Sequence, residues 1–192
     1  MRTASTGQSS PQSVSTATPL TAQSSSAGAP AEPSLSLSAA AAHQEGRPAL
    51  SPEMTTIHFG LENQSAQKTL YVYSDPDCPA CRRFEPHLVS LAKDFSIYVL
   101  PVAYQSGSDE MARKILCASD KSAKWTEVMD VMSTDEHVTG NVCGQAEIGL
   151  RANMQAFDAM GFTQTPRVVS GTGYVFAAGA TASDIRAQAS LH

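Results

Sequence analysis

The sequence has no long apolar run and no cluster of basic residues. Its lysines and arginines are scattered and its formal net charge is -5, so no basic stripe is available to neutralise a phosphate backbone. We therefore expect no nucleic-acid partner. No stretch approaches the roughly 18 apolar residues that a membrane-spanning helix needs, so no membrane span is predicted.

The first 54 residues contain no aromatic side chain. They consist mainly of Ser, Ala, Thr, Pro, Gln and Gly, a composition that buries too little apolar surface to offset the entropy lost on ordering the chain. We interpret residues 1–54 as a disordered, low-complexity leader or linker. The small residues at positions 35–42 resemble the end of an export signal, but the apolar stretch is weak and no basic cluster precedes it, so no signal peptide is predicted.

Residues 55–192 hold every Phe, Tyr and Trp and all four cysteines, and this length suffices for one domain with a sizeable core. Their apolar patterns predict strands at 56–59, 69–74 and 96–103, and a hairpin of 168–170 and 174–177. A first helix is predicted to reach residue 93 with a kink at Pro86, followed by helices at 109–118, 123–132 and 145–160. A closing helix is predicted near 184–189, capped by Thr181 or Ser183. This order predicts an α/β fold with a mixed central sheet, helices on both faces, and a helical insertion at about 108–160 between a βαβ half and a ββα half.

The motif Cys78-Pro79-Ala80-Cys81 follows the predicted strand at 69–74 and begins the first helix. Unpaired N–H groups and the positive end of the helix dipole stabilise a thiolate there, so we expect the pKa of Cys78 to lie below the roughly 8.5 of a free thiol. Cys78 is therefore predicted to be a nucleophile. Cys81 follows three residues later on the same face, where it can attack a mixed disulfide on Cys78 as the resolving thiol. The spacing favours thiol–disulfide exchange.

A second signal is Thr165-Pro166, which precedes the β-rich run at 167–169. A proline here can be cis, and a cis-proline loop beside the two thiols would hold the extended backbone of a partner against the reactive sulfur. A trans proline that starts an edge strand is the alternative. For exchange we expect Pro79, Ala80, Thr165 and Pro166 to bind substrate, and we expect no cofactor and no metal.

Four other side chains could suggest chemistry, and we expect ordinary roles for each. Glu85 could relay a proton to Cys81, but a solvated glutamate is the favoured interpretation. His87 is expected at the surface, away from the cysteine face, and Trp125 in the core. His137 is expected to have no chemical role.

The order of these elements, with the cysteine motif opening the first helix and Thr165-Pro166 opening the hairpin, resembles the thioredoxin superfamily. Within it the chain is most similar to the DsbC and DsbG branch of bacterial periplasmic disulfide isomerases and related oxidoreductases. Residues 71–81 resemble that branch's strand-to-active-site segment, with Asp75 three residues before the first cysteine. Thr165 is similar to the threonine before its cis-proline, and the resemblance covers roughly residues 55–188.

The resemblance implies that Cys117 and Cys143 form a second, structural disulfide. Such a bond indicates an oxidising compartment, the periplasm or another exported location, whereas two buried free cysteines in a cytosolic protein are the alternative. The resemblance also implies substrate proteins with disulfides or thiols, and a membrane redox partner of the DsbD or DsbB type.

Two features distinguish the chain from the isomerases of that branch. Residues 1–54 resemble neither their N-terminal dimerisation domain nor their helical linker, so oxidation or reduction of one disulfide at a time is a simpler expectation than isomerisation. Pro79-Ala80 adds no charge and lacks the histidine of the strongest oxidants, which predicts an intermediate reduction potential.

Two functions of other classes stay open. Cys78 and Cys81 could be soft ligands for copper or zinc, although a tetrahedral zinc site would also need Cys117 and Cys143. The groove near Pro166 could instead belong to a non-catalytic binding module or holdase.

Overall fold

The computed structural model describes residue 50, residues 54–130 and residues 138–191, all within one compact unit that spans Ala40–His192. Apart from residues 50 and 54, the predicted leader at 1–54 lies outside the described residues, as do His137 and the last two residues of the helix predicted at 123–132. The division into a leader and a domain at 55–192 therefore stays a prediction.

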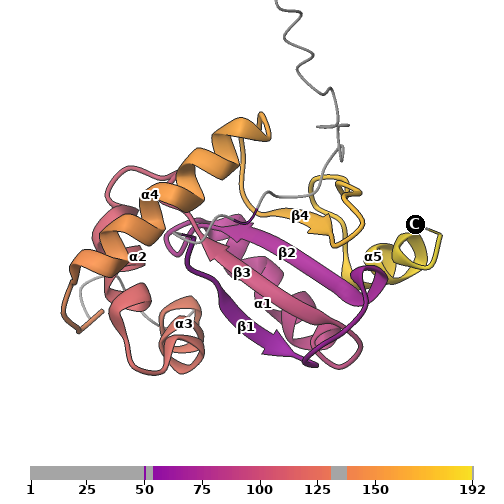
Figure 1. The fold of residues 1–192 in the computed structure, drawn as a ribbon, viewed down its shortest axis with the longest axis horizontal. Helices are drawn as coiled ribbons and strands as arrows, with labels where there is room; N and C mark the ends of the chain where they lie inside the picture. The colour runs from indigo at the N-terminus through magenta and orange to yellow at the C-terminus, as the bar shows by residue number, and fades with distance from the viewer. Residues whose placement is uncertain (1–49, 51–53, 131–137, 192) are drawn as a thin grey trace, which may run out of the picture. The chain divides into compact units, whose positions relative to one another are not determined.

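Four strands form one mixed sheet in the order β1-β3-β2-β4 (Figure 1). They are β1 (Ile57–Gly60), β2 (Thr69–Ser74), β3 (Ser96–Pro101) and β4 (Arg167–Ser170). β2 and β3 are parallel, as expected for strands joined by a crossover helix, whereas β1 pairs antiparallel with β3 and β4 antiparallel with β2. The predicted mixed sheet is confirmed.

Within the described residues, five α-helices and one short 3-10 helix accompany the sheet. They are η1 (Ala66–Lys68), α1 (Pro79–Leu91), α2 (Ser108–Cys117), α3 (Lys121–Met129), α4 (Gly144–Ala159) and α5 (Ala182–Ala189). The predicted helical insertion corresponds to α2, α3 and α4, between β3 and β4. Pro86 lies inside α1, which continues past it. Thr181 caps α5, because its hydroxyl accepts a hydrogen bond from the Asp184 N–H while the Asp184 carboxylate accepts one from the Thr181 N–H.

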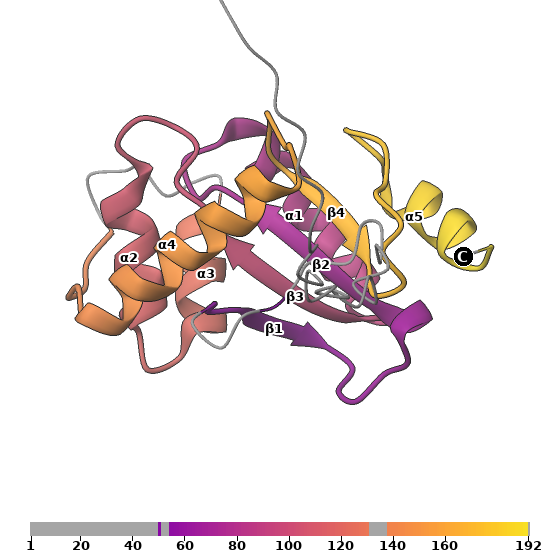
Figure 2. The same cartoon turned by 45° about the horizontal axis from the view of Figure 1, so that its top comes forward.

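Helices cover both faces of the sheet, as the alternation of side chains along a strand requires. On one face the strands pack with α1, α3 and α5, and on the other with α4. Figure 2 shows α1 behind the strands and α4 in front of them. The buried residues of the first face include Leu70, Val72, Ile97, Val99, Leu88, Trp125 and Ile185, and those of the second include Tyr71, Tyr73, Leu100, Val169 and Phe157.

The predicted hairpin is wrong in its second half. Residues 174–177 form no strand and keep a single bridge, between Val169 and Val175. The Tyr174 N–H is donated to the Ser170 hydroxyl oxygen, and the Ser170 carbonyl accepts from the Gly173 N–H. Two backbone bonds still join the segments, from the Ser170 N–H to the Tyr174 carbonyl and from the Phe176 N–H to the Val168 carbonyl. The Tyr174 N–H, however, bonds to the Ser170 side chain in place of the Ser170 carbonyl, so the ladder does not continue toward the turn.

None of the helices in the described part of the chain combines the length and the hydropathy needed to cross a membrane.

Candidate active site

The cysteine motif lies at the junction between β2 and α1. A turn of three residues, Asp75 to Asp77, separates the end of β2 from Cys78, which is the N-cap of α1. Pro79 is the first residue of the helix, a position where its missing N–H costs nothing and its fixed φ suits the helix. The motif therefore places both sulfurs at the N-terminal end of α1, as the sequence predicts.

The two cysteines of the motif are reduced and differ in accessibility. Both are free thiols. Cys78 keeps 5% of its surface exposed and Cys81 keeps none. A partner's sulfur can therefore reach Cys78 first, whereas Cys81 is covered by the core on the α1 side of the sheet.

The environment of Cys78 favours the thiolate. A hydrogen bond from the Cys81 thiol lowers the pKa of Cys78 to about 5, with further help from the Thr165 side chain and the backbone N–H groups of Cys81 and Ala80, while burial opposes the shift. The sequence argument rested on the N–H groups and the helix dipole alone. The larger cause is the neighbouring thiol, which the structure brings into hydrogen-bonding range.

Cys81 behaves in the opposite way. Burial raises the pKa of Cys81 far above that of a free thiol, and its hydrogen bond to Cys78 raises it further, against smaller opposing contributions that include Ser74 and the Asp75 N–H. The single proton of the pair therefore stays on the Cys81 sulfur, from which it is donated to the Cys78 thiolate. This asymmetry favours a thiolate at Cys78 and a protonated thiol at Cys81 at neutral pH.

The Thr165-Pro166 segment lies over Cys78. Its peptide bond is cis, and the Cys78 thiol donates to the Thr165 carbonyl oxygen at 3.7 Å when it is protonated. The Thr165 hydroxyl is buried and has no hydrogen-bond partner at normal distance among the described residues. That hydroxyl is therefore available to donate to a thiolate.

A cavity of about 320 Å³ opens between one face of α1 and the Thr165-Pro166 segment, next to the motif, although neither Cys78 nor Cys81 lines it. Three of the predicted substrate-binding residues line it, namely Ala80, Thr165 and Pro166, whereas Pro79 does not. Sequence reasoning missed the remaining lining residues, which are Arg83, Phe84, His87, Gln164, Ala178, Gly179 and Ala180. Helical spacing from Ala80 could have indicated the first three, because residues at i+3, i+4 and i+7 share its face.

His87 is not the surface residue that the sequence predicts. It is half-buried, its Nδ1 accepts a hydrogen bond from the Ala182 N–H at 3.5 Å, and its ring lies 5.8 Å from that of Phe84. The N-terminus of α5 packs here and covers a helix face that would otherwise meet solvent.

Glu85 is also not the solvated side chain that the sequence predicts. Its carboxylate is half-buried and accepts a hydrogen bond from the Trp125 indole N–H at 3.1 Å. Burial raises the pKa of Glu85 to about 7, although that hydrogen bond opposes the shift. Trp125 itself is fully buried, as predicted.

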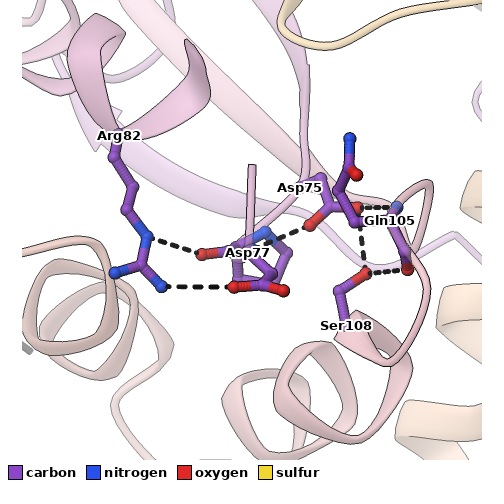
Figure 3. Close-up of polar contacts among 6 residues, drawn as sticks. Asp75, Asp77, Arg82, Gln105 and Ser108 are labelled. Atoms are coloured by element: carbon purple, nitrogen blue, oxygen red, sulfur yellow. Dashed lines mark hydrogen bonds and ion pairs between the residues drawn. The ribbon is translucent and has the colours of Figure 1, made fainter. Parts of the chain in front are cut away.

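A polar cluster holds the turn between β2 and Cys78 (Figure 3). Asp75 is fully buried, and its carboxylate accepts hydrogen bonds from the Asp77 N–H, the Gln105 N–H and the Ser108 hydroxyl. On the other side of the turn, Arg82 lies 3.7 Å from the Asp77 carboxylate and donates to the Pro76 carbonyl. Asp75 thus ties the turn to Gln105 and Ser108, and Arg82 ties it to α1.

Cys117 and Cys143 are joined by a disulfide at the C-terminal end of α2 and the N-terminal end of α4, with a Cα–Cα distance of 5.7 Å. They are therefore not free to join Cys78 and Cys81 as ligands. Across the described residues, no three His, Cys, Asp or Glu side chains gather as a metal site would require.

Comparison with known proteins places the chain among thioredoxins. The thioredoxin family model matches residues 53–160. A comparison with curated proteins gives no match.

Three solved structures illustrate the likeness. The catalytic domain of Proteus mirabilis ScsC is 16% identical with a TM-score of 0.60, over 70% of this chain and 89% of that one. A periplasmic thioredoxin-like protein from Salmonella enterica serovar Typhimurium is 17% identical with a TM-score of 0.61, over 75% and 92%. A disulfide interchange protein from Neisseria gonorrhoeae is 22% identical with a TM-score of 0.55, over 71% and 94%.

At these identities the structural likeness shows a shared fold, the α/β thioredoxin-like fold. The match to the family model shows family membership as well as fold, since it covers more than half of the 192 residues and includes the Cys78–Cys81 motif. On that match, this chain belongs to the thioredoxin family.

Proposed function

We propose that the chain is a thiol–disulfide oxidoreductase that acts on the disulfides and thiols of other proteins, with Cys78 as nucleophile and Cys81 as resolving thiol. One observation carries the proposal: at the start of α1 the pKa of Cys78 is lowered to about 5 by the Cys81 thiol, while burial raises that of Cys81. The attacking group in this chemistry is the thiolate. Neutral pH therefore leaves the more exposed sulfur reactive and the buried one protonated.

The reaction proceeds in two exchanges. The Cys78 thiolate attacks one sulfur of a partner disulfide, forms a mixed disulfide, and releases the other partner sulfur as a thiolate, which takes up a proton. Cys81 then loses its proton and attacks the Cys78 sulfur. The Cys78–Cys81 bond forms, the second partner sulfur leaves, and the proton from Cys81 ends on that sulfur through solvent. The partner gains two electrons and the motif loses them, and the reverse sequence oxidises a partner dithiol.

Residues around the sulfurs supply the substrate site. Ala80, Thr165 and Pro166 line the cavity next to the motif, and we assign to Thr165 and Pro166 the alignment of an extended partner backbone. Pro79 lies at the start of α1, outside the cavity lining, so its contribution is to the geometry of the motif. The buried Thr165 hydroxyl offers a donor to the Cys78 thiolate or to a partner's sulfur.

The proposal includes a relationship to the DsbC and DsbG branch and a location in the periplasm or another exported compartment. The Cys117–Cys143 disulfide supports the periplasm or another exported location, because such bonds persist in oxidising surroundings. The Salmonella structure that shares the fold is described as periplasmic. In that setting a membrane partner of the DsbD or DsbB type would reduce or oxidise the motif.

Activity of cysteine variants tests the proposal. We expect Cys78→Ser to abolish reduction of insulin and refolding of a protein with scrambled disulfides. We expect Cys81→Ser to trap mixed disulfides with substrate, because the attacking thiol is kept and the resolving thiol is lost. The double variant Cys117→Ser/Cys143→Ser is the control for loss of two other cysteines, and at temperatures where it stays folded it should keep exchange activity because it leaves the motif intact.

Other results would point to another function. Unchanged turnover in Cys78→Ser would overturn the oxidoreductase. Stoichiometric copper or zinc in the reduced protein would favour the metal-binding module, for which the described residues supply only two clustered sulfurs. Protection of an unfolded client that persists in a Cys78→Ser/Cys81→Ser double variant, without any exchange activity, would favour the holdase.

A further inference from the structure

Asp75 is the residue through which the turn before the motif is attached to the rest of the molecule. It follows the last residue of β2, and both the residue and Ser108 are fully buried. Burying a carboxylate is unfavourable unless donors compensate it. Asp75 has three, at 2.8 Å from the Asp77 N–H, 2.6 Å from the Gln105 N–H and 2.9 Å from the Ser108 hydroxyl (Figure 3).

The main chain of Asp75 contacts the motif at both cysteines. Its N–H donates to the Cys81 sulfur at 3.4 Å, and its carbonyl oxygen accepts from the Cys78 N–H at 3.1 Å. The carboxylate and the main chain of one residue thus face different partners. The carboxylate binds the loop between β3 and α2, and the main chain binds the start of α1.

We infer that Asp75 is a positioning residue for the resolving step: its carboxylate, anchored to Gln105 and Ser108, holds its own N–H against the Cys81 sulfur so that Cys81 can attack a mixed disulfide at Cys78. This inference rests on the proposed function. An N–H aimed at a sulfur stabilises the thiolate that must form there. The Asp75 N–H is one of the groups that oppose the rise in the pKa of Cys81 caused by burial.

The negative charge of Asp75 and its positioning of the N–H have opposite effects on the rate at which Cys81 attacks. A negative charge near a thiol disfavours the thiolate, so loss of that charge alone would speed attack by Cys81. Loss of the anchor would instead move the N–H away from the sulfur and slow the attack. Whether the attack by Cys81 becomes faster or slower in a variant of Asp75 therefore distinguishes the loss of charge from the loss of positioning.

Asp75→Asn is the direct test. Its amide keeps the size of the carboxylate but has a single acceptor oxygen, so it cannot accept from the Asp77 N–H on one side and the Gln105 N–H on the other. The probe is an aromatic disulfide whose thiolate product absorbs visible light. Attack by the Cys78 thiolate releases one aromatic thiolate and leaves a mixed disulfide, and Cys81 attack releases the second, forms the Cys78–Cys81 bond and passes the Cys81 proton to the buffer.

The expected result is an unchanged first release and a slower second release. If the pKa of Cys81 rises by about one unit, its thiolate fraction falls tenfold while its nucleophilicity rises about threefold, which slows the second phase about threefold and moves its pH profile to higher pH. A purely structural role would lower the stability of the variant but would not move that profile in the folded protein.

Asp77→Asn is the matched control. It removes a carboxylate from the same turn, one that faces Arg82 in Figure 3. The control should not slow the second phase. If Asp75→Asn fails to fold, Ser108→Ala decides, because it removes one of the three donors and should slow the same phase by a smaller factor.

The outcomes are distinct. A second phase in folded Asp75→Asn that is unchanged or faster than that of the unmodified protein overturns the positioning role, as does an unchanged second phase in Ser108→Ala when Asp75→Asn does not fold. Absence of any Cys78-dependent release in the unmodified protein would overturn the proposed function itself, which is a different result.

Discussion

The Trp125 indole N–H on α3 donates a hydrogen bond to the Glu85 carboxylate on α1, at 3.1 Å. The indole is fully buried and the carboxylate is half-buried between the same helices. A carboxyl that is neutral and one that is ionised both accept this bond, but burial penalises only the ionised form. Burial of the carboxylate in this contact therefore makes the stability of the protein depend on the protonation of Glu85.

We expect stability to fall as pH rises because of Glu85. Burial raises the pKa of Glu85 from 4.5 to about 7, so between these values the folded state binds more protons than the unfolded state and the free energy of unfolding decreases with pH. The full shift corresponds to on the order of 3 kcal/mol. Glu85→Gln, which keeps an acceptor for Trp125, should be more stable than the unmodified protein by about that amount at pH 8 and equal to it at pH 4.

Urea denaturation of both proteins across this pH range measures the difference. Glu62→Gln is the control, because Glu62 is exposed, and it should leave the pH dependence unchanged. A constant difference between Glu85→Gln and the unmodified protein from pH 4 to pH 8 would contradict the prediction.

The alkylation rate of Cys78 should follow a titration near pH 5. The hydrogen bond from Cys81 lowers the pKa of Cys78 to about 5, so the rate with iodoacetamide should rise through that pH and level off before neutrality. Thr165→Val removes a hydroxyl that helps to stabilise the thiolate and should move the midpoint to higher pH. Thr163→Val, at an exposed position, is the control and should not. An identical midpoint in Thr165→Val and Thr163→Val would show that the hydroxyl has no such role.

The Cys78–Cys81 pair should have an intermediate reduction potential. A stabilised thiolate makes the reduced form more stable and the disulfide a stronger oxidant. The pKa of about 5 lies between the values of about 3.5 and about 7 that accompany potentials of roughly -120 and -270 mV. Equilibration with glutathione, with the Cys117–Cys143 bond checked by mass spectrometry, measures it. A reduction potential near roughly -120 mV or near roughly -270 mV would contradict the intermediate value expected here.

Loss of the Cys117–Cys143 disulfide should destabilise the domain. The bond closes a loop with a sequence separation of 26, for which the chain-entropy relation gives about 3.5 kcal/mol. Cys117→Ala/Cys143→Ala should lose about that much in urea denaturation. Cys117 is half-buried and Cys143 is exposed, so packing adds little. A loss below about 1 kcal/mol would mean that the bond does little to restrict the unfolded chain.

Local patterns in the sequence were sufficient for most of the fold. The apolar run at 69–74 became β2 with the same bounds, and the helical spacing after Gly144 became α4 within one residue at either end. These features depend on neighbours along the chain, namely the period of the apolar residues and the turn and capping chemistry at the ends. The prediction of a thiolate at Cys78 belongs to the same class, since it was based on a helix N-terminus, although the larger cause in the structure is the Cys81 thiol.

Contacts between distant segments decided the rest. Glu85 became half-buried because α3 places Trp125 against it, and His87 lines the cavity because α5 packs beside it. The hairpin shortened because the Ser170 side chain competes for a ladder N–H. The periodicity of apolar residues in the sequence does not predict these pairings, because each pair belongs to different elements that meet only when the chain packs.

The sequence by itself therefore determined an α/β fold with a mixed sheet and two thiols at the start of a helix, because periodicity and helix-end chemistry are local, and the resemblance to a known superfamily supplied the thioredoxin-like topology. Only the tertiary structure decided how those thiols share a proton, which hydroxyl and which N–H face them, and that Asp75 joins them to the loop before α2. Burial and hydrogen bonding set the state of a thiol, and both are properties of the packed chain.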